Sequence, residues 1–154
     1  AGQHAARNRR QAAPGGAEGV AGPGGAGAVC GARRRSQRYA RALRAGLVMG
    51  IHSDAPVTPL APLFTAWAAV NRLTASGVTL GSDECISVDE ALYAITLGAA
   101  QTLHLDHEVG SIAVGKRADF AVLEHDPYEV PPEALHRIKV WGTVQAGRLF
   151  PASL

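Results

Sequence analysis

The sequence predicts an α/β fold whose last forty residues are rich in β-strand, and three observations predict it. Residues 36–51 read as helix, glycine and strand, which is half of a βαβ unit. Residues 61–75 and 87–103 carry apolar side chains at helical spacing. From residue 118 the apolar period changes to two, which is typical of strands. At 154 residues the chain is long enough to bury a core.

The first 35 residues differ in composition from the rest, because Gly, Ala, Arg and Pro dominate and large apolar side chains are almost absent. Nothing there offsets the entropy of ordering, so we expect residues 1–35 to be disordered. GC-rich DNA translated in the wrong frame would give the same composition. We therefore divide the chain into this segment, an α/β part at 36–109 and a β-rich part at 110–154.

Charge is distributed unevenly along the chain. Residues 1–46 hold nine Arg and one acidic residue, a net charge of +8, whereas residues 47–154 have a net charge of −6. A basic arm of this kind suggests nucleic-acid binding. Tyr39 is the only aromatic residue in the arm, so we expect no nucleic-acid partner. Salt-dependent DNA affinity that is lost with residues 1–46 would support that alternative.

Cysteine content and hydropathy bear on the compartment. Cys30 and Cys85 are too few for a disulfide scaffold and form no CxxC pair, which favours a reducing, cytoplasmic setting. No apolar run is long enough to cross a bilayer, and the first residues lack the hydrophobic core of a secretory signal. We therefore expect no membrane partner.

Local signals place the elements. A helix at 36–45 has Ser36 as N-cap and Gly46 after its end, and a strand at 47–51 follows. Ser76-Gly77 ends the helix at 61–75, and the capping box Ser87–Glu90 opens a helix that runs to Leu103. The remaining elements are a strand at 118–123, a helical turn at 131–135 and a hairpin of 138–144 with 148–150 turning at Ala146-Gly147.

The candidate functional stretch is Leu47–Pro56, in which an apolar strand stops at His52-Ser53-Asp54. An acid at the carboxyl end of a parallel strand can bind a metal or transfer a proton to and from water. An aspartate before Ala-Pro is equally ordinary turn chemistry, so spacing alone leaves both readings of Asp54 open. Strand alternation places His52 on the same face. We favour a structural or substrate-contacting role for His52 over metal ligation.

Two other motifs are weaker candidates for a functional site. Gly110–Arg117 imitates a phosphate-binding loop, but Arg117 replaces the required Ser or Thr, and a helix precedes where a strand belongs. His104 and His107 are three residues apart at a helix end, where they would interact with the helix dipole. Neither motif predicts a ligand site.

Several motifs in order resemble the amidohydrolase superfamily, in particular its third family. They are Ile51–Val57, Pro59–Leu63, Trp67–Arg72, Ile86–Leu92, Thr96–Ala100, Gly110–Leu123 and Asp126-Pro127. The resemblance covers about residues 36–154, and residues 1–32 match nothing in that family. It implies a metal-bearing (β/α)8 barrel with a small β-sandwich. Residues 47–51 would then be the eighth barrel strand, and residues 110–150 the C-terminal share of the sandwich.

The resemblance also implies an activity, the hydrolysis of carbon–nitrogen bonds other than peptide bonds in small amide-like substrates. It implies that Asp54 contacts a divalent metal, zinc above all, and acts as general base and then general acid. His52 stands where many members have Gly. The H-x-H pair and further ligands of the family have no match here, so we expect a C-terminal fragment that is inactive and metal-free alone. A non-catalytic interaction protein, with self-association through exposed apolar surface, is the alternative.

Overall fold

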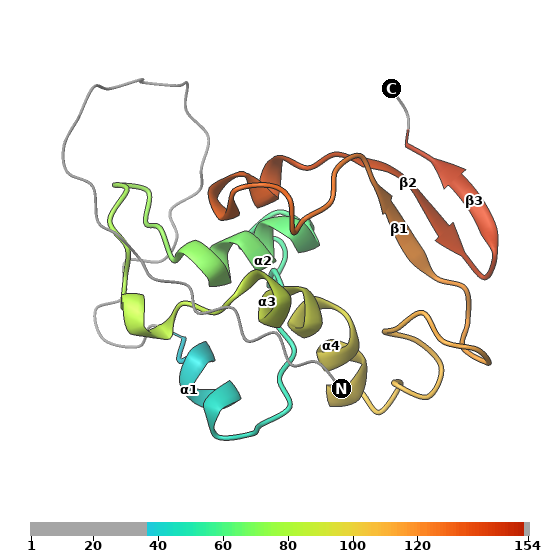
Figure 1. The fold of residues 1–154 in the computed structure, drawn as a ribbon, viewed down its shortest axis with the longest axis horizontal. Helices are drawn as coiled ribbons and strands as arrows, with labels where there is room; N and C mark the ends of the chain where they lie inside the picture. Colours follow the sequence, from blue (N-terminus) through green and yellow to red (C-terminus); the bar gives the residue numbers. More distant parts are fainter. Residues whose placement is uncertain (1–36, 153–154) are drawn as a thin grey trace, which may run out of the picture.

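The computed structural model describes residues 37–152. Its elements in chain order are α1 (Tyr39–Arg44), α2 (Pro62–Asn71), η1 (Ser82–Glu84), α3 (Val88–Ile95), α4 (Leu97–Thr102), β1 (Phe120–Leu123), η2 (Pro132–Arg137), β2 (Val140–Gln145) and β3 (Arg148–Pro151). The helices gather in one group, and the strands form a sheet beside it (Figure 1). This mixed content agrees with the coarse fold class. The expected disorder of residues 1–35 lies outside the described residues.

Helix α2 lies at the centre of the helical group, where it packs against α3 and η2, and α3 packs against α4 (Figure 1). The buried core is built mainly from small side chains on these helices, which allow close approach. Its members are Ala40, Ile51, Ala66, Ala69, Ile86, Ala91, Ala94, Leu135 and Ile138. Among residues 37–152, Leu135 is the only large side chain that is fully buried. The core therefore depends on close backbone packing more than on bulky side chains.

Helix α1 is held at both ends by identifiable bonds. It begins at Tyr39 rather than beside Ser36, which lies outside the described residues. The buried carboxylate of Glu84 in η1 accepts a 3.0 Å hydrogen bond from the Arg41 N–H, one of the free donors of the first turn. At the other end Gly46 has φ of 73°, and its N–H and that of Leu47 donate back into the helix. The predicted glycine C-cap is confirmed as a Schellman motif.

The strand predicted at 47–51 is not formed. Residues 47–53 have no ladder partner, and the Ile51 N–H donates instead to the Ala94 carbonyl of α3 at 3.1 Å. Gly98 of α4 lies directly against the Met49 carbonyl, where a Cβ would clash. A strand exists only where a neighbouring strand pairs with it. The strands in the described part of the chain, β1 to β3, form a separate sheet, so the predicted strand was wrong.

Two helix boundaries differ from the prediction. Helix α2 ends at Asn71, because Arg72 adopts a left-handed conformation with φ of 50°, and Ser76-Gly77 lies beyond it in a turn. The helix predicted at 87–103 is divided into α3 and α4 at Thr96 (φ −123°, ψ −97°). The Thr96 hydroxyl donates to the Leu92 carbonyl at 2.6 Å, and this side-chain bond competes with the regular helix pattern.

The start of α3 follows the predicted capping box. The Glu90 N–H donates to the Ser87 hydroxyl at 3.1 Å, and the Ser87 N–H donates to the Glu90 carboxylate at 2.7 Å. Two donors of the first turn are thereby satisfied, as the sequence pattern predicts.

The sheet has the strand order β1-β2-β3, with both pairs antiparallel. The hairpin turns at Ala146 (φ 49°) and Gly147 (φ 81°), and positive φ at both positions is the type I′ pattern. The Asp119 carboxylate accepts the Ala146 N–H at 2.7 Å and pairs with Arg117, which ties the turn to the start of β1. The predicted hairpin, strand and helical turn are confirmed as elements, although the strand predicted at 118–123 begins at Phe120 and the first hairpin strand begins at Val140.

No helix within residues 37–152 is both long enough and apolar enough to cross a membrane.

Candidate functional site

The candidate site is a tight turn that follows the unpaired segment 47–53 and leads into α2. Asp54 lies at its first corner with φ of 50°, a left-handed conformation that aspartate tolerates better than most residues. The Val57 N–H donates to the Asp54 carbonyl at 2.8 Å and closes the turn. The Thr58 hydroxyl donates to the Ser53 carbonyl across it. The Ala55–Pro56 peptide bond inside the turn is cis.

His52 contacts the same turn through its ring. The Asp54 N–H donates to His52 Nδ1 at 3.0 Å. The sequence prediction placed the two residues together by strand alternation, but that argument does not apply because no strand is formed. They meet through the hydrogen bond that the Asp54 N–H donates to the imidazole two residues earlier in the chain.

The Asp54 carboxylate remains exposed. Both backbone polar groups of Asp54 are engaged, the N–H by His52 and the carbonyl by Val57. Within residues 37–152, no protein group donates a hydrogen bond to the carboxylate oxygens. Asp54 thus occupies a turn, as one of its two readings from the sequence expects, and its side chain stays exposed without a capping bond within residues 37–152.

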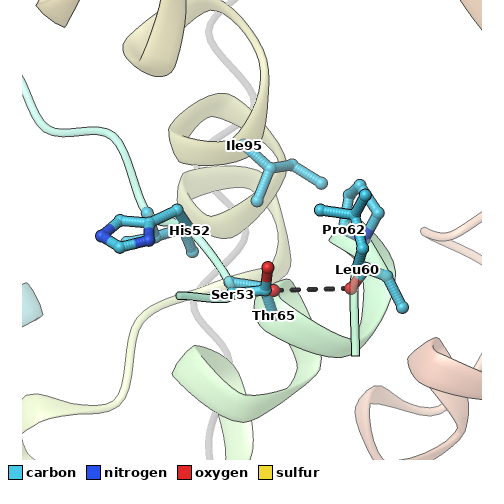
Figure 2. Close-up of a pocket in the computed structure, with 8 residues that line it drawn as sticks. His52, Ser53, Leu60, Pro62, Thr65 and Ile95 are labelled. Atoms are coloured by element: carbon cyan, nitrogen blue, oxygen red, sulfur yellow. Dashed lines mark hydrogen bonds between the residues drawn. The ribbon is translucent and has the colours of Figure 1, made fainter. Parts of the chain in front are cut away.

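A shallow open pocket lies beside the turn. Its lining comes from segment 51–53, from the approach and first turn of α2, and from Ile95 of α3. The lining is mainly apolar, and the polar side chains in it besides His52 are Ser53 and Thr65. Figure 2 shows the His52 ring pointing away from Leu60 and Pro62, while the Thr65 hydroxyl donates to the Ala61 carbonyl at 3.4 Å. The imidazole therefore faces the turn and not the centre of the pocket.

The donors near Asp54 do not fit a metal ion by themselves. No group of three or more His, Cys, Asp or Glu side chains able to hold a metal occurs in the part of the chain that the structure describes. At Asp54 the nearby donor is His52, whose Nδ1 already accepts a hydrogen bond. His104 and His107 lie on the exposed segment after α4, where His107 pairs with Glu108 at 3.4 Å. A zinc site normally needs three or four protein ligands.

Sequence reasoning did not single out two hydroxyl residues of this region. Thr58 closes the turn, and Thr65 lies in the first turn of α2 against the pocket. The signal available in the sequence for Thr58 was its spacing, since a Thr four residues after a turn aspartate is well placed to bond back across the turn.

Two arginines of the basic arm are engaged within the fold. Arg41 pairs with Glu84, and Arg44 donates a hydrogen bond to the Asp83 carbonyl.

Comparison with known proteins identifies the family. The model described as "Amidohydrolase family" matches residues 9–150. The chain belongs to the amidohydrolase family. This confirms the resemblance inferred from the motifs and corrects its extent, because the match begins at residue 9 rather than at residue 36. Residues 9–35 are rich in Gly and Ala and contain none of the motifs that indicated the resemblance.

Among similar curated proteins, the N-substituted formamide deformylase of Arthrobacter pascens is 36% identical over 107 residues, which cover 70% of this chain and 20% of that protein. Two solved structures share the fold. An amidohydrolase of Thermotoga maritima MSB8 has a TM-score of 0.57 at 23% identity and covers 74% of this chain and 26% of its own. The E. coli guanine deaminase has a TM-score of 0.54 at 25% identity, over 73% of this chain and 30% of its own. The chain spans about a fifth of the length of the curated relative.

Proposed function

We propose that this chain supplies the proton-transferring carboxylate of an amidohydrolase that cleaves carbon–nitrogen bonds other than peptide bonds. Membership of the family gives the reaction class. The observation that carries the assignment to a residue is the turn at Asp54, whose backbone groups are both bonded while its carboxylate is exposed and unbonded within the described residues.

The chemistry needs such a group. Hydrolysis adds the oxygen of water to the carbonyl carbon and releases the nitrogen as an amine, so one proton must pass from water to the nitrogen. A carboxylate can accept that proton as the C–O bond forms and donate it to the departing nitrogen. Asp54 is proposed for both steps, as general base and then general acid.

The substrate class follows by analogy with the relative. The Arthrobacter pascens protein is named for N-substituted formamides, so small N-substituted amides are the first probes to use here. A mainly apolar pocket next to Asp54, lined by residues such as Leu60 and Ile95, suits an apolar substituent on the nitrogen.

By family resemblance the complete site uses a divalent metal ion, which we propose to be zinc. Because residues 37–152 do not bring together enough donors, we propose that the isolated chain neither binds zinc stoichiometrically nor turns over substrate. The remaining ligands would come from regions that the relatives have and this chain does not match.

A segment exchange tests the proposed function. The 107 aligned residues of the formamide deformylase are replaced by the corresponding residues of this chain, and hydrolysis of N-substituted formamides is measured. The expected result is measurable hydrolysis by the exchanged protein and none by the isolated 154-residue chain. A folded exchange protein that binds zinc but has no activity would count against the function. Turnover by the isolated chain with one zinc bound would contradict the proposed inactivity.

A further inference from the structure

We infer that His52 is a positioning residue for Asp54, holding the turn by accepting the Asp54 N–H at Nδ1 and carrying its own ring proton at Nε2. This inference rests on the proposed function, because it concerns the carboxylate assigned there. The observation behind it is the 3.0 Å hydrogen bond between the Asp54 N–H and His52 Nδ1.

The tautomer follows from the direction of that bond. A backbone N–H can only donate, so Nδ1 must offer its lone pair. A neutral imidazole carries a single ring proton, which therefore resides on Nε2. The same bond withdraws Nδ1 from metal ligation and leaves Nε2–H as the hydrogen-bond donor of the ring.

The spacing gives the contact its structural role. An Asn or Asp side chain often accepts the N–H two residues later, in an Asx turn, and His52 makes the equivalent bond to Asp54 with a ring nitrogen. Asp54 has φ of 50°, so its backbone needs such support. Together with the bond from Val57 to the Asp54 carbonyl, the imidazole fixes the peptide groups on both sides of the carboxylate-bearing carbon.

Orientation favours positioning over substrate contact. The ring points away from Leu60 and Pro62, which line the pocket (Figure 2). His52 is exposed, so its direction is set by the hydrogen bond and not by burial. His52 therefore acts through Asp54. Replacing its ring should weaken the turn only when the hydrogen-bond acceptor for the Asp54 N–H is lost.

Two variants of the full chain separate the acceptor from the ring. His52→Phe keeps an aromatic ring without an acceptor, and His52→Asn keeps an acceptor at Asx-turn distance without the ring. Nitrogen NMR of the wild-type chain at about pH 8, where an ordinary imidazole is neutral, reports which ring nitrogen is protonated. Solvent-exchange NMR of the Asp54 amide reports the hydrogen bond in all three proteins.

The expected result is a protonated Nε2 and an unprotonated Nδ1 in the wild type. The Asp54 amide should exchange about fivefold faster in His52→Phe, from the net worth of a typical hydrogen bond, and at nearly the wild-type rate in His52→Asn. A proton on Nδ1, equal exchange in His52→Phe and wild type, or an undispersed wild-type spectrum would each overturn the inference. None of these readouts needs activity, so a failure of the proposed function would be seen separately in the segment exchange.

Discussion

At the scale of single residues, the chain contains a histidine whose surroundings are unlike those of Asp54 and His52. His136 of η2 packs against the stacked Trp67 and Phe64 rings of α2, 4.6 Å from the Trp67 ring and 6.4 Å from the Phe64 ring, measured between centroids. Its Nδ1 is buried and has no hydrogen-bond partner within the described residues. Burial lowers the pKa of His136 below its ordinary value of 6.5, and the nearby positive charge of Arg137 lowers it further.

This environment predicts a pH dependence of stability. Because the folded pKa of His136 lies below the unfolded one, the unfolded state binds more protons between the two values. The contribution is therefore fully present above about pH 6.5 and decreases as the pH falls through that window. Urea unfolding at pH 8 and pH 5 should show a smaller loss of stability in His136→Phe than in the wild type. The exposed His125→Gln serves as control, and an equal loss in all three proteins would contradict the assignment to His136.

The residues of the site could be chosen from the sequence only in part. Asp54 can be singled out from its motif, because a polar triplet after an apolar run is a local signal, and its catalytic role stays a prediction. The left-handed conformation of Asp54 and the role of His52 as an acceptor could not be predicted, since both depend on backbone angles that the residue types do not dictate. Strand alternation correctly placed His52 beside Asp54, but no strand forms there, and the two residues meet through a hydrogen bond in a turn.

At the scale of elements, helix ends are determined by short-range bonds wherever the structure follows the sequence. The capping box at the start of α3 and the Schellman motif at the end of α1 are examples. Both depend on residues no more than five positions apart, which is why the sequence predicts them. The hairpin at Ala146-Gly147 is equally local, because its turn type selects the residues.

Removal of the capping box should destabilise α3 measurably. Ser87→Ala removes the acceptor for the Glu90 N–H, and the loss of an N-cap side chain typically costs about 1 kcal/mol of unfolding free energy. Ser87→Asp restores an acceptor and should retain most of the wild-type stability. Chemical unfolding followed by circular dichroism measures the difference. Equal stability of Ser87→Ala and Ser87→Asp would mean that the cap contributes nothing.

The predictions that failed concern elements whose form depends on distant partners. Residues 47–51 have the composition of a strand but pack against α3 and α4, because no strand within residues 37–152 lies beside them. The break at Thr96 depends on a side-chain bond that competes with the helix, and on the close approach of Gly98 to Met49. Periodicity cannot reveal either cause, since it records only which face is apolar.

At the scale of the whole molecule, the chain leaves much apolar surface uncovered. Leu60 and Ile112 are 85% and 88% exposed, and one face of the sheet carries Phe120 and Leu149, which are 40% and 48% exposed. The strand register places Phe120, Val144 and Leu149 side by side on that face. Contiguous exposed apolar residues of this kind favour association.

We therefore predict concentration-dependent self-association of the 154-residue chain. Leu149→Lys should shift its size-exclusion elution toward the monomer, because it places a charge on the apolar sheet face, directly opposite Val144. Thr143→Lys adds the same charge to the opposite face, beside the exposed Phe150, so a shift in Leu149→Lys alone assigns the association to the face of Phe120 and Leu149. Identical elution of both variants and the wild type at all concentrations would show that this face takes no part in association.

Asp54 is proposed as the proton-transferring carboxylate of an amidohydrolase site, and its replacement in an active protein tests that role. In the segment-exchanged formamide deformylase, Asp54→Asn should lower kcat by about 10²- to 10⁴-fold, the usual contribution of general acid–base catalysis. Asp83→Asn changes another exposed aspartate, for which the structure records only a bond to its backbone carbonyl, and should leave kcat unchanged. A kcat for Asp54→Asn within twofold of the parent, in a folded and zinc-loaded protein, would contradict the claim.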